Sequence, residues 1–130
     1  MENLKISSGS PLENVIGFSR ARRVGNYIAV SGTAPINKDG TTHGIGDPEL
    51  QARKCLEIIN DALKEAGSGL SDVIRTRILL KRISDWEKVA KVHAIYFQHI
   101  KPATTFLEVK GFVKPEWLVE IEVDAIAPDK

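Results

Sequence analysis

The sequence predicts an α+β fold, in which two helices pack on one face of a single mixed β-sheet. Three observations lead to this prediction. Stretches of alternating apolar and polar residues, typical of strands, occur near both ends of the chain. Two amphipathic stretches with helical spacing lie between them. Two helices of this length can cover one face of a sheet but not both. The expected order is β-β-α-β-α-β-β, in one domain that spans residues 1–130.

The first two strands are expected within residues 22–31. Gly25 and Asn26 can supply the positive φ values of a tight hairpin turn, and Tyr27 and Ile28 favour a strand after it. Residues 37–46 are rich in Gly, Thr and Asp, which indicates a surface loop.

The first helix is expected to begin with Asp47 as N-cap and Pro48 at the first helical position. Gly67 is a suitable residue to end it. One apolar stripe recurs every three or four residues and comprises Ala52, Cys55, Leu56, Ile59, Ala62, Leu63 and Ala66.

Residues 72–83 are rich in Ile, Val and Leu, which predicts the next strand. Ser84 and Glu87 have the spacing of a capping box, so a second helix is expected to start there. Its buried face would comprise Trp86, Val89, Ala90, His93, Tyr96 and Phe97. Two strands, 104–109 and 117–127, close the chain around a turn through Gly111 and Pro115.

The sheet face that the helices leave uncovered carries many charges. Along the last strand, Trp117, Val119, Ile121, Val123 and Ala125 are expected under the helices, and Glu120, Glu122 and Asp124 on the open face. On the strand at 72–83, Val73, Arg75, Arg77, Leu79 and Lys81 share one face. This face is either a solvated surface with weak Arg–Glu pairs or, with Leu79, Leu118 and Phe106 on it, a contact with another subunit.

Composition limits the function classes. The chain is 42% hydrophobic and has 18 Lys and Arg against 17 Asp and Glu, so no strong field attracts nucleic acid or an acidic membrane. Cys55 is the single cysteine, which fits a reducing cytosol, and its apolar surroundings favour an inert buried thiol. No signal peptide or membrane-spanning run is recognisable. We therefore expect a cytoplasmic protein.

The stretches at 17–36, 56–80, 102–111 and 118–127 together resemble the Rid family, also called YjgF or L-PSP proteins. The resemblance implies a chorismate-mutase-like fold and a homotrimer with three small-molecule clefts between subunits. It also implies hydrolysis of reactive imines and enamines, such as 2-aminoacrylate, with no metal and no organic cofactor.

At one position the chain departs from the imine-hydrolysing members. Where they carry an arginine that grips the substrate carboxylate, this chain has Thr104, followed by Thr105. Loss of such a charged contact should weaken ligand binding by about 1.5–3 kcal/mol. Phe18 replaces a common tyrosine, and Phe106 a common cysteine. In the second helix, Ala90 and His93 replace a common asparagine and tyrosine.

Glu120 is the candidate catalytic residue, because a sheltered carboxylate can orient or deprotonate the water that attacks an imine. The alternative is that Glu120 only pairs with Arg75 or Arg77. The candidate ligand-binding residues are Phe18, Ser31, Gly32, Thr104 and Thr105. Neighbouring strand residues face opposite ways, so at most one threonine can point into the cleft, and the resemblance assigns that position to Thr104.

The histidines His43, His93 and His99 lack metal-ligand spacing. The cluster Arg20, Arg22 and Arg23 could steer an anion, but such a cluster is usually a solvated strand end. Three functions remain open. The first is an imine or enamine hydrolase that works through Glu120 with altered substrate choice, for example on a substrate without the usual α-carboxylate, and that is weak or inactive on 2-aminoacrylate. The second is a non-catalytic trimeric protein that binds a small metabolite. The third and weakest is a ribonuclease or translation inhibitor, because RNA binding favours a basic, aromatic-rich groove.

Overall fold

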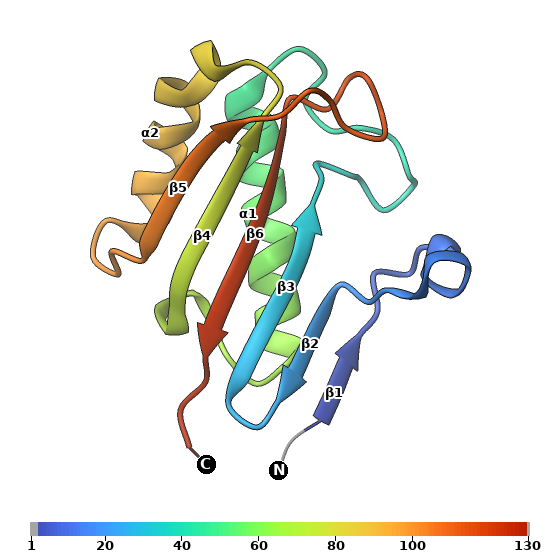
Figure 1. Cartoon of the computed structure of the whole chain (residues 1–130), viewed down its shortest axis with the longest axis vertical. Coiled ribbons are helices and arrows are strands. Elements are labelled where there is room, and N and C mark those ends of the chain that lie inside the picture. Colours follow the sequence, from blue (N-terminus) through green and yellow to red (C-terminus); the bar gives the residue numbers. More distant parts are fainter. Residues whose placement is uncertain (1–2, 130) are drawn as a thin grey trace.

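A computed structural model describes residues 3–129 and shows a six-stranded mixed sheet with two helices over one face (Figure 1). The strand order is β1-β2-β3-β6-β4-β5. All neighbouring strands are antiparallel except β4 and β5, which are parallel. The strands are β1 (Asn3–Ile6), β2 (Ala21–Val24), β3 (Tyr27–Thr33), β4 (Val73–Leu80), β5 (Ala103–Glu108) and β6 (Val119–Ile126). The helices are α1 (Pro48–Glu65) and α2 (Trp86–Phe97), with short helical turns η1 (Glu13–Gly17), η2 (Leu70–Asp72) and η3 (Ile83–Asp85).

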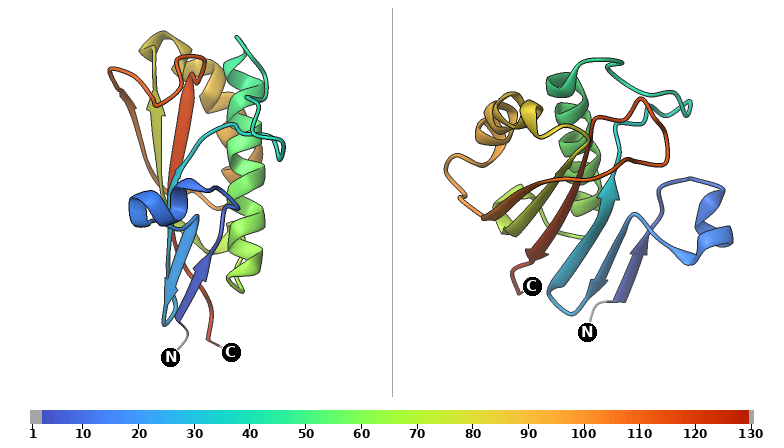
Figure 2. Two further views of the ribbon diagram at one scale, coloured as in Figure 1. Left: turned by 90° about the vertical axis from the view of Figure 1, so that its right-hand side faces the viewer. Right: turned by 45° about the horizontal axis from the view of Figure 1, so that its top comes forward.

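The predicted fold class is confirmed, with one strand added. β1 pairs with β2 at the sheet edge, and its four residues are too short to show a clear alternation. Viewed along the sheet, both main helices lie on one side, and η1 projects on the other (Figure 2). The segment that leads from η1 into β2 therefore covers part of the open face of the sheet. None of the helices formed by the described residues is long and apolar enough to cross a membrane.

Local signals explain both ends of α1. The Asp47 carboxylate accepts hydrogen bonds from the backbone N–H groups of Glu49 and Leu50, at 3.0 and 3.1 Å. Gly67 adopts φ +82°, a left-handed conformation that ends the helix at low cost. The capping box predicted at the start of α2 is wrong: the N-cap is Asp85, whose side chain accepts no hydrogen bond from the helix.

The core lies between the helices and the sheet. The predicted apolar stripe of α1 is buried, as are Val119, Ile121, Val123 and Ala125 of β6. The buried face predicted for α2 is only partly correct. Trp86 is 45% exposed, and Val92, which the prediction omitted, is buried.

The faces predicted for β4 need a correction at its start. The pairing of β4 with β6 shifts between Val73 and Arg75, which is a β-bulge. Val73 is therefore buried in the core, and Ile74 is 49% exposed, the reverse of the simple alternation. Beyond the bulge, Arg77 and Leu79 lie on the open face as predicted.

Two residues expected on the open face are not exposed there. Phe106 pairs with the buried Ile78 and packs its ring edge-to-face on Trp86 and near His93, so it faces α2. Leu118 is only 6% exposed within the single chain. Exposed apolar surface on the open side comes instead from residues such as Leu107.

Candidate functional site

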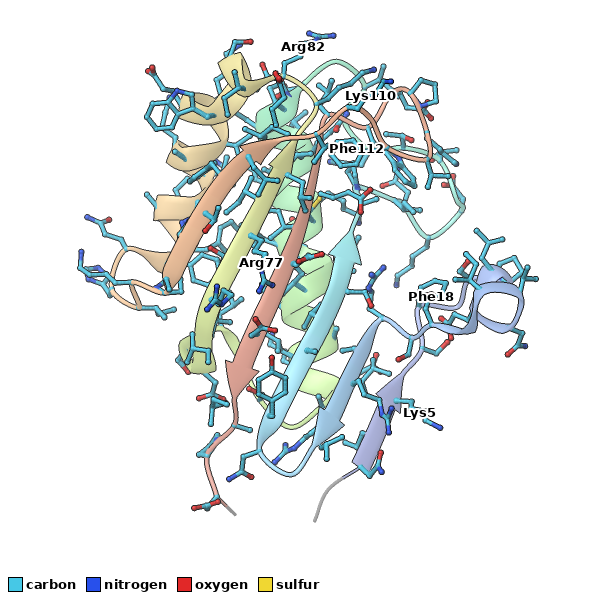
Figure 3. The ribbon with its side chains drawn as sticks, viewed as in Figure 1. Lys5, Phe18, Arg77, Arg82, Lys110 and Phe112 are labelled. Carbon is cyan, nitrogen blue, oxygen red and sulfur yellow. The ribbon has the colours of Figure 1, made fainter. Side chains whose placement is uncertain are left out.

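A hollow of about 740 Å³ lies on the open face, between η1, β3 and β6. Figure 3 shows Phe18 and Lys5 on one side of it and Arg77 across the sheet. Its walls also include Ser19, Arg22, Ser31, Glu122 and Asp124. The hollow thus brings together Phe18 and Ser31, two residues that the sequence marks as ligand-binding candidates.

Backbone hydrogen bonds hold these candidates in place. The Ser31 N–H donates to the Arg20 carbonyl at 3.0 Å, and the Arg20 N–H donates to the Ile6 carbonyl at 2.7 Å. The Ser31 hydroxyl donates to the Ser19 carbonyl at 2.6 Å. The two residues after Phe18, Ser19 and Arg20, are therefore hydrogen-bonded to β3 and fix the position of Phe18. The hydroxyl oxygen of Ser31 can still accept a hydrogen bond.

Glu120 lies on β6, opposite Leu79, and its carboxylate sits over Gly32 of β3. A Cβ atom on Gly32 would be only 2.9 Å from Glu120 Oε1, so a glycine is needed for this approach. Burial raises the pKa of Glu120 above its ordinary value of 4.5, while the positive charge of Arg20 lowers the pKa and the charge of Glu122 raises it. Burial of a carboxylate favours its neutral form, which suits a group that exchanges a proton near neutral pH.

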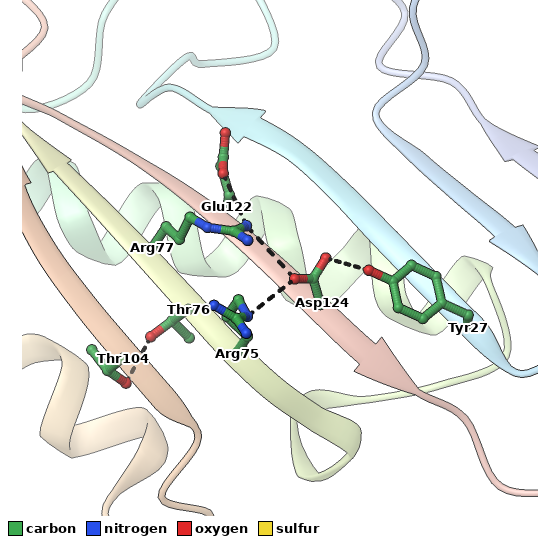
Figure 4. A network of polar contacts seen from close by, with 7 residues as sticks. All are labelled: Tyr27, Arg75, Thr76, Arg77, Thr104, Glu122 and Asp124. Atoms are coloured by element: carbon green, nitrogen blue, oxygen red, sulfur yellow. Dashed lines mark hydrogen bonds and ion pairs between the residues drawn. The ribbon is translucent and has the colours of Figure 1, made fainter.

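The alternative role for Glu120, as partner of Arg75 or Arg77, is not observed. Arg77 Nη1 lies 3.3 Å from Glu122 Oε1 and 3.6 Å from Asp124 Oδ2. Arg75 Nε lies 3.7 Å from Asp124, which also accepts a hydrogen bond from the Tyr27 hydroxyl at 2.9 Å (Figure 4). None of the ion pairs between residues 3 and 129 includes Glu120. The network uses Glu122 and Asp124 and leaves Glu120 outside it.

Neither Thr104 nor Thr105 lines the hollow within one chain; both lie on β5, the edge strand opposite β1. Thr104 faces the α2 side, where its Oγ1 is 2.9 Å from Thr76 Oγ1 (Figure 4). Thr105 pairs with Arg77 and shares its open face. The structure therefore places Phe18, Ser31, Gly32 and Glu120 at the β2–β3–β6 part of the open face. Thr105 shares that face but lies on the edge strand β5, and Thr104 lies on the opposite face, toward α2.

A directed chain of hydrogen bonds occupies the Thr104 hydroxyl. Thr104 donates to the Pro102 carbonyl at 3.0 Å, so it accepts from Thr76. Thr76 in turn accepts from His93 Nε2, at 2.9 Å. His93 then carries a proton on Nε2, and burial lowers the pKa of its ring. His93 lies on the side of α2 that faces the sheet, where it is packed beside Phe97 and hydrogen-bonded to Thr76.

Within the described residues, no group of three or more His, Cys, Asp or Glu side chains is placed to hold a metal ion. Cys55 is fully buried on α1, and burial raises the pKa of its thiol strongly. The thiol is therefore protonated at neutral pH and unsuited to act as a nucleophile.

Comparison with known proteins places this site in a family. The family described as endoribonuclease L-PSP matches residues 9–127. The chain belongs to this family. Its members include the YjgF and Rid proteins, so the resemblance seen in the sequence is confirmed.

Among relatives of this Rid protein, an uncharacterised protein of Streptomyces coelicolor is 37% identical over 121 residues, which cover 93% of this chain and 90% of that protein. The 3-aminoacrylate deaminase RutC of Acinetobacter baylyi is 36% identical over 101 residues, covering 78% and 79%.

Solved structures of the Rid family have the same fold. A Mycobacterium tuberculosis member of the YjgF/YER057c/UK114 family superimposes with a TM-score of 0.87 at 40% identity, covering 97% of this chain and all of that one. The Escherichia coli YjgF gene product gives 0.78 at 26% identity, covering 97% and 94%.

Three arginines near β2 show what the sequence alone missed. The expectation of a solvated strand end holds for the exposed Arg22 but is wrong for the other two. Arg23 is 1% exposed and donates to the carbonyls of Gly25 and Ala66, at 2.8 and 2.6 Å. Arg20 is half-buried and donates to the Gly32 carbonyl at 2.6 Å. Only the alternation along β2 hinted that neighbouring arginines would differ in burial.

Proposed function

We propose that this Rid protein hydrolyses enamines or imines, with Glu120 as the residue that activates water. The observation that carries the proposal is the Glu120 carboxylate: it is half-buried, lies against Gly32, and takes no part in the ion pairs of the open face. The RutC relative is named a 3-aminoacrylate deaminase, which supports the same reaction class here.

The chemistry needs little beyond this carboxylate. A protonated imine is already electrophilic at carbon, so the protein has to position it and remove a proton from the attacking water. Burial raises the pKa of Glu120, which makes the ionised carboxylate a stronger base than an exposed one. The hydroxyl adds to carbon, and Glu120 passes the proton it took from water to the amino nitrogen. The C–N bond then breaks, ammonia leaves, and the hydroxyl proton returns to Glu120 as the oxo compound forms. Phe18 and Ser31 would line the substrate pocket beside Gly32.

We also propose that the working unit is a cytoplasmic homotrimer with a cleft between neighbouring chains. Thr105 and Leu107 lie on the open side of the edge strand β5, across the sheet from the hollow. A second copy of the chain is needed to bring that edge next to Phe18 and Ser31. Light scattering should give one species with three times the mass of 14.3 kDa. A species of any other mass would contradict the trimer.

The substrate choice is expected to differ from that of arginine-bearing relatives. Thr104 has no charge, and its hydroxyl is already engaged by Thr76 and Pro102. We therefore expect weak or no hydrolysis of 2-aminoacrylate.

The test is a coupled assay in which an amino-acid oxidase generates imines from a panel of amino acids and semicarbazide traps them. Wild type is compared with Glu120→Gln and with Glu57→Gln, which changes an exposed acid of α1 outside the hollow. Faster imine loss that disappears only in Glu120→Gln supports the proposal. Equal activity in Glu120→Gln refutes the role of Glu120.

Two other outcomes separate the alternatives. If no imine is hydrolysed faster than in buffer, the result favours a small-molecule-binding protein without this chemistry. RNA binding that weakens steeply with salt would instead favour the activity in the family's name, although the 18 basic and 17 acidic residues give no basic excess for it.

A further inference from the structure

Arg20 occupies an unusual position for a charged side chain. Its backbone is fixed on both sides, by the bonds to Ile6 and Ser31, where the chain enters β2. Its guanidinium turns toward β3, and Nη2 donates to the Gly32 carbonyl at 2.6 Å. This places the guanidinium beside the residue on which the Glu120 carboxylate rests.

The guanidinium has donors that the protein does not use. Arginine carries five N–H donors, and the bond to Gly32 uses one of them. Nε is buried and has no hydrogen-bond partner among the described residues. No acidic group lies within ion-pair distance of Arg20 in that part of the chain. The bond to Gly32 leaves further N–H groups on Nη1 and Nη2, and a charge-assisted bond from a guanidinium to a carboxylate is among the strong hydrogen bonds.

Among the charged groups that act on Arg20, Glu120 has the largest effect. Burial lowers the pKa of Arg20, and the negative charge of Glu120 raises it, yet the two groups form no direct pair. They lie on either side of Gly32: the guanidinium holds its carbonyl, and Glu120 Oε1 lies 2.9 Å from where its Cβ would be. A cation and a carboxylate are thus held next to each other, separated by a residue without a side chain.

The other arginines of this region are committed elsewhere. Arg75 and Arg77 pair with acids of β6. Arg23 is buried against the end of α1, and Arg22 is exposed and donates to Asn3. Arg20 is therefore the arginine beside Glu120 whose positive charge is available to bind an anionic ligand.

We propose that Arg20 binds the carboxylate of the substrate, and that the substrates are small imino or enamino acids whose reacting carbon lies at Glu120. The inference rests on the proposed function, because it assigns the substrate class of that same site. Arg20 supplies the charge that Thr104 lacks, but from β2 and not from β5. The carboxylate is then held at a different place relative to Glu120 than in the arginine-bearing relatives, and we expect a different substrate choice for that reason.

The test measures binding of 2-oxobutanoate, a product-like acid, and of the neutral 2-oxobutanamide, by NMR titration of the full-length protein. A charge-assisted contact should make the acid bind about ten- to hundred-fold more tightly than the amide. Arg20→Gln should lose this preference while still binding the amide, because only the charge is removed. Arg53→Gln, which changes an exposed arginine of α1 outside the hollow, should keep the preference.

Arg20→Lys is the control for a structural effect, because Arg20 also donates a hydrogen bond to the Gly32 carbonyl. If Arg20→Gln loses both ligands but Arg20→Lys keeps a preference for the acid, the charge at this position is confirmed as the cause. A preference that survives in Arg20→Gln, or that is absent in the wild type, overturns the inference.

Failure of this inference can be told apart from failure of the proposed function. Hydrolysis that depends on Glu120, with an unchanged acid preference in Arg20→Gln, refutes the role of Arg20 alone. An acid preference lost in Arg20→Gln, in a protein that hydrolyses no imine, refutes the hydrolase and leaves Arg20 as a carboxylate-binding residue.

Discussion

Replacement of Gly32 by alanine should reduce activity without unfolding the protein. The new Cβ would lie 2.9 Å from Glu120 Oε1, and ordinary contacts of this kind begin at about 3.4 Å. One of the two has to move by about 0.5 Å. The atom in the way is the end of a rotatable side chain, so the carboxylate retreats and the backbone stays. Gly32 is not among the glycines with positive φ, so alanine introduces no backbone strain.

The substitution is expected to change the reaction rate much more than the free energy of unfolding. A catalytic group misplaced by about 1 Å can cost about a hundredfold in rate, so a shift of half that size should cost about tenfold. In stability, alanine at a compatible glycine position adds about 0.4–1 kcal/mol, which offsets the displacement of Glu120. We expect the free energy of unfolding to stay within about 1 kcal/mol of the wild-type value.

The measurements are the imine-hydrolysis rate and urea unfolding followed by the fluorescence of Trp86 and Trp117, at one protein concentration because an oligomer's stability depends on it. Gly111→Ala is the matched control, since a Cβ there would meet no atom within 4 Å. A loss of stability above about 2 kcal/mol in Gly32→Ala would show that the backbone yields instead. Unchanged activity would show that the position of the Glu120 carboxylate does not matter.

Three further predictions concern buried polar groups. Arg23→Met should lower the free energy of unfolding by about 2–4 kcal/mol, because two buried carbonyls lose a charged donor, whereas Arg22→Met should change it by less than about 0.5 kcal/mol in the same urea titration. Glu120→Gln should melt at a higher temperature than wild type at neutral pH and at the same temperature below pH 4. The pKa of Glu120 in the folded wild type is raised, so the folded state binds the proton more tightly than the unfolded state. Wild-type stability therefore falls as pH rises through that pKa. Cys55 should react with a thiol reagent only when urea unfolds the chain; rapid labelling of the native protein would contradict its burial.

Much of the fold follows from local patterns in the sequence. The alternation along β6 predicts which residues face the helices, because a strand turns successive side chains to opposite sides. The cap at Asp47 and the glycine at position 67 mark the ends of α1 for reasons that lie within a few residues. Motifs in a fixed order along the chain are likewise sufficient to indicate the family.

Other features depend on partners distant in the chain. The bulge at Val73 and Arg75 exists because β4 must pair with β6, almost fifty residues later, and no local pattern marks it. β1 is a strand only because β2 offers it an edge.

The site shows the same division between local and distant causes. Sequence resemblance singled out Glu120, Gly32, Ser31 and Phe18, and alternation placed Glu120 on the open face. The sequence could not show that Arg20 and Arg23, three residues apart, would meet Gly32 and Ala66 respectively. A long flexible side chain finds its partner only after strands and helices have packed, so the burial and charge balance of an arginine are decided by the tertiary structure.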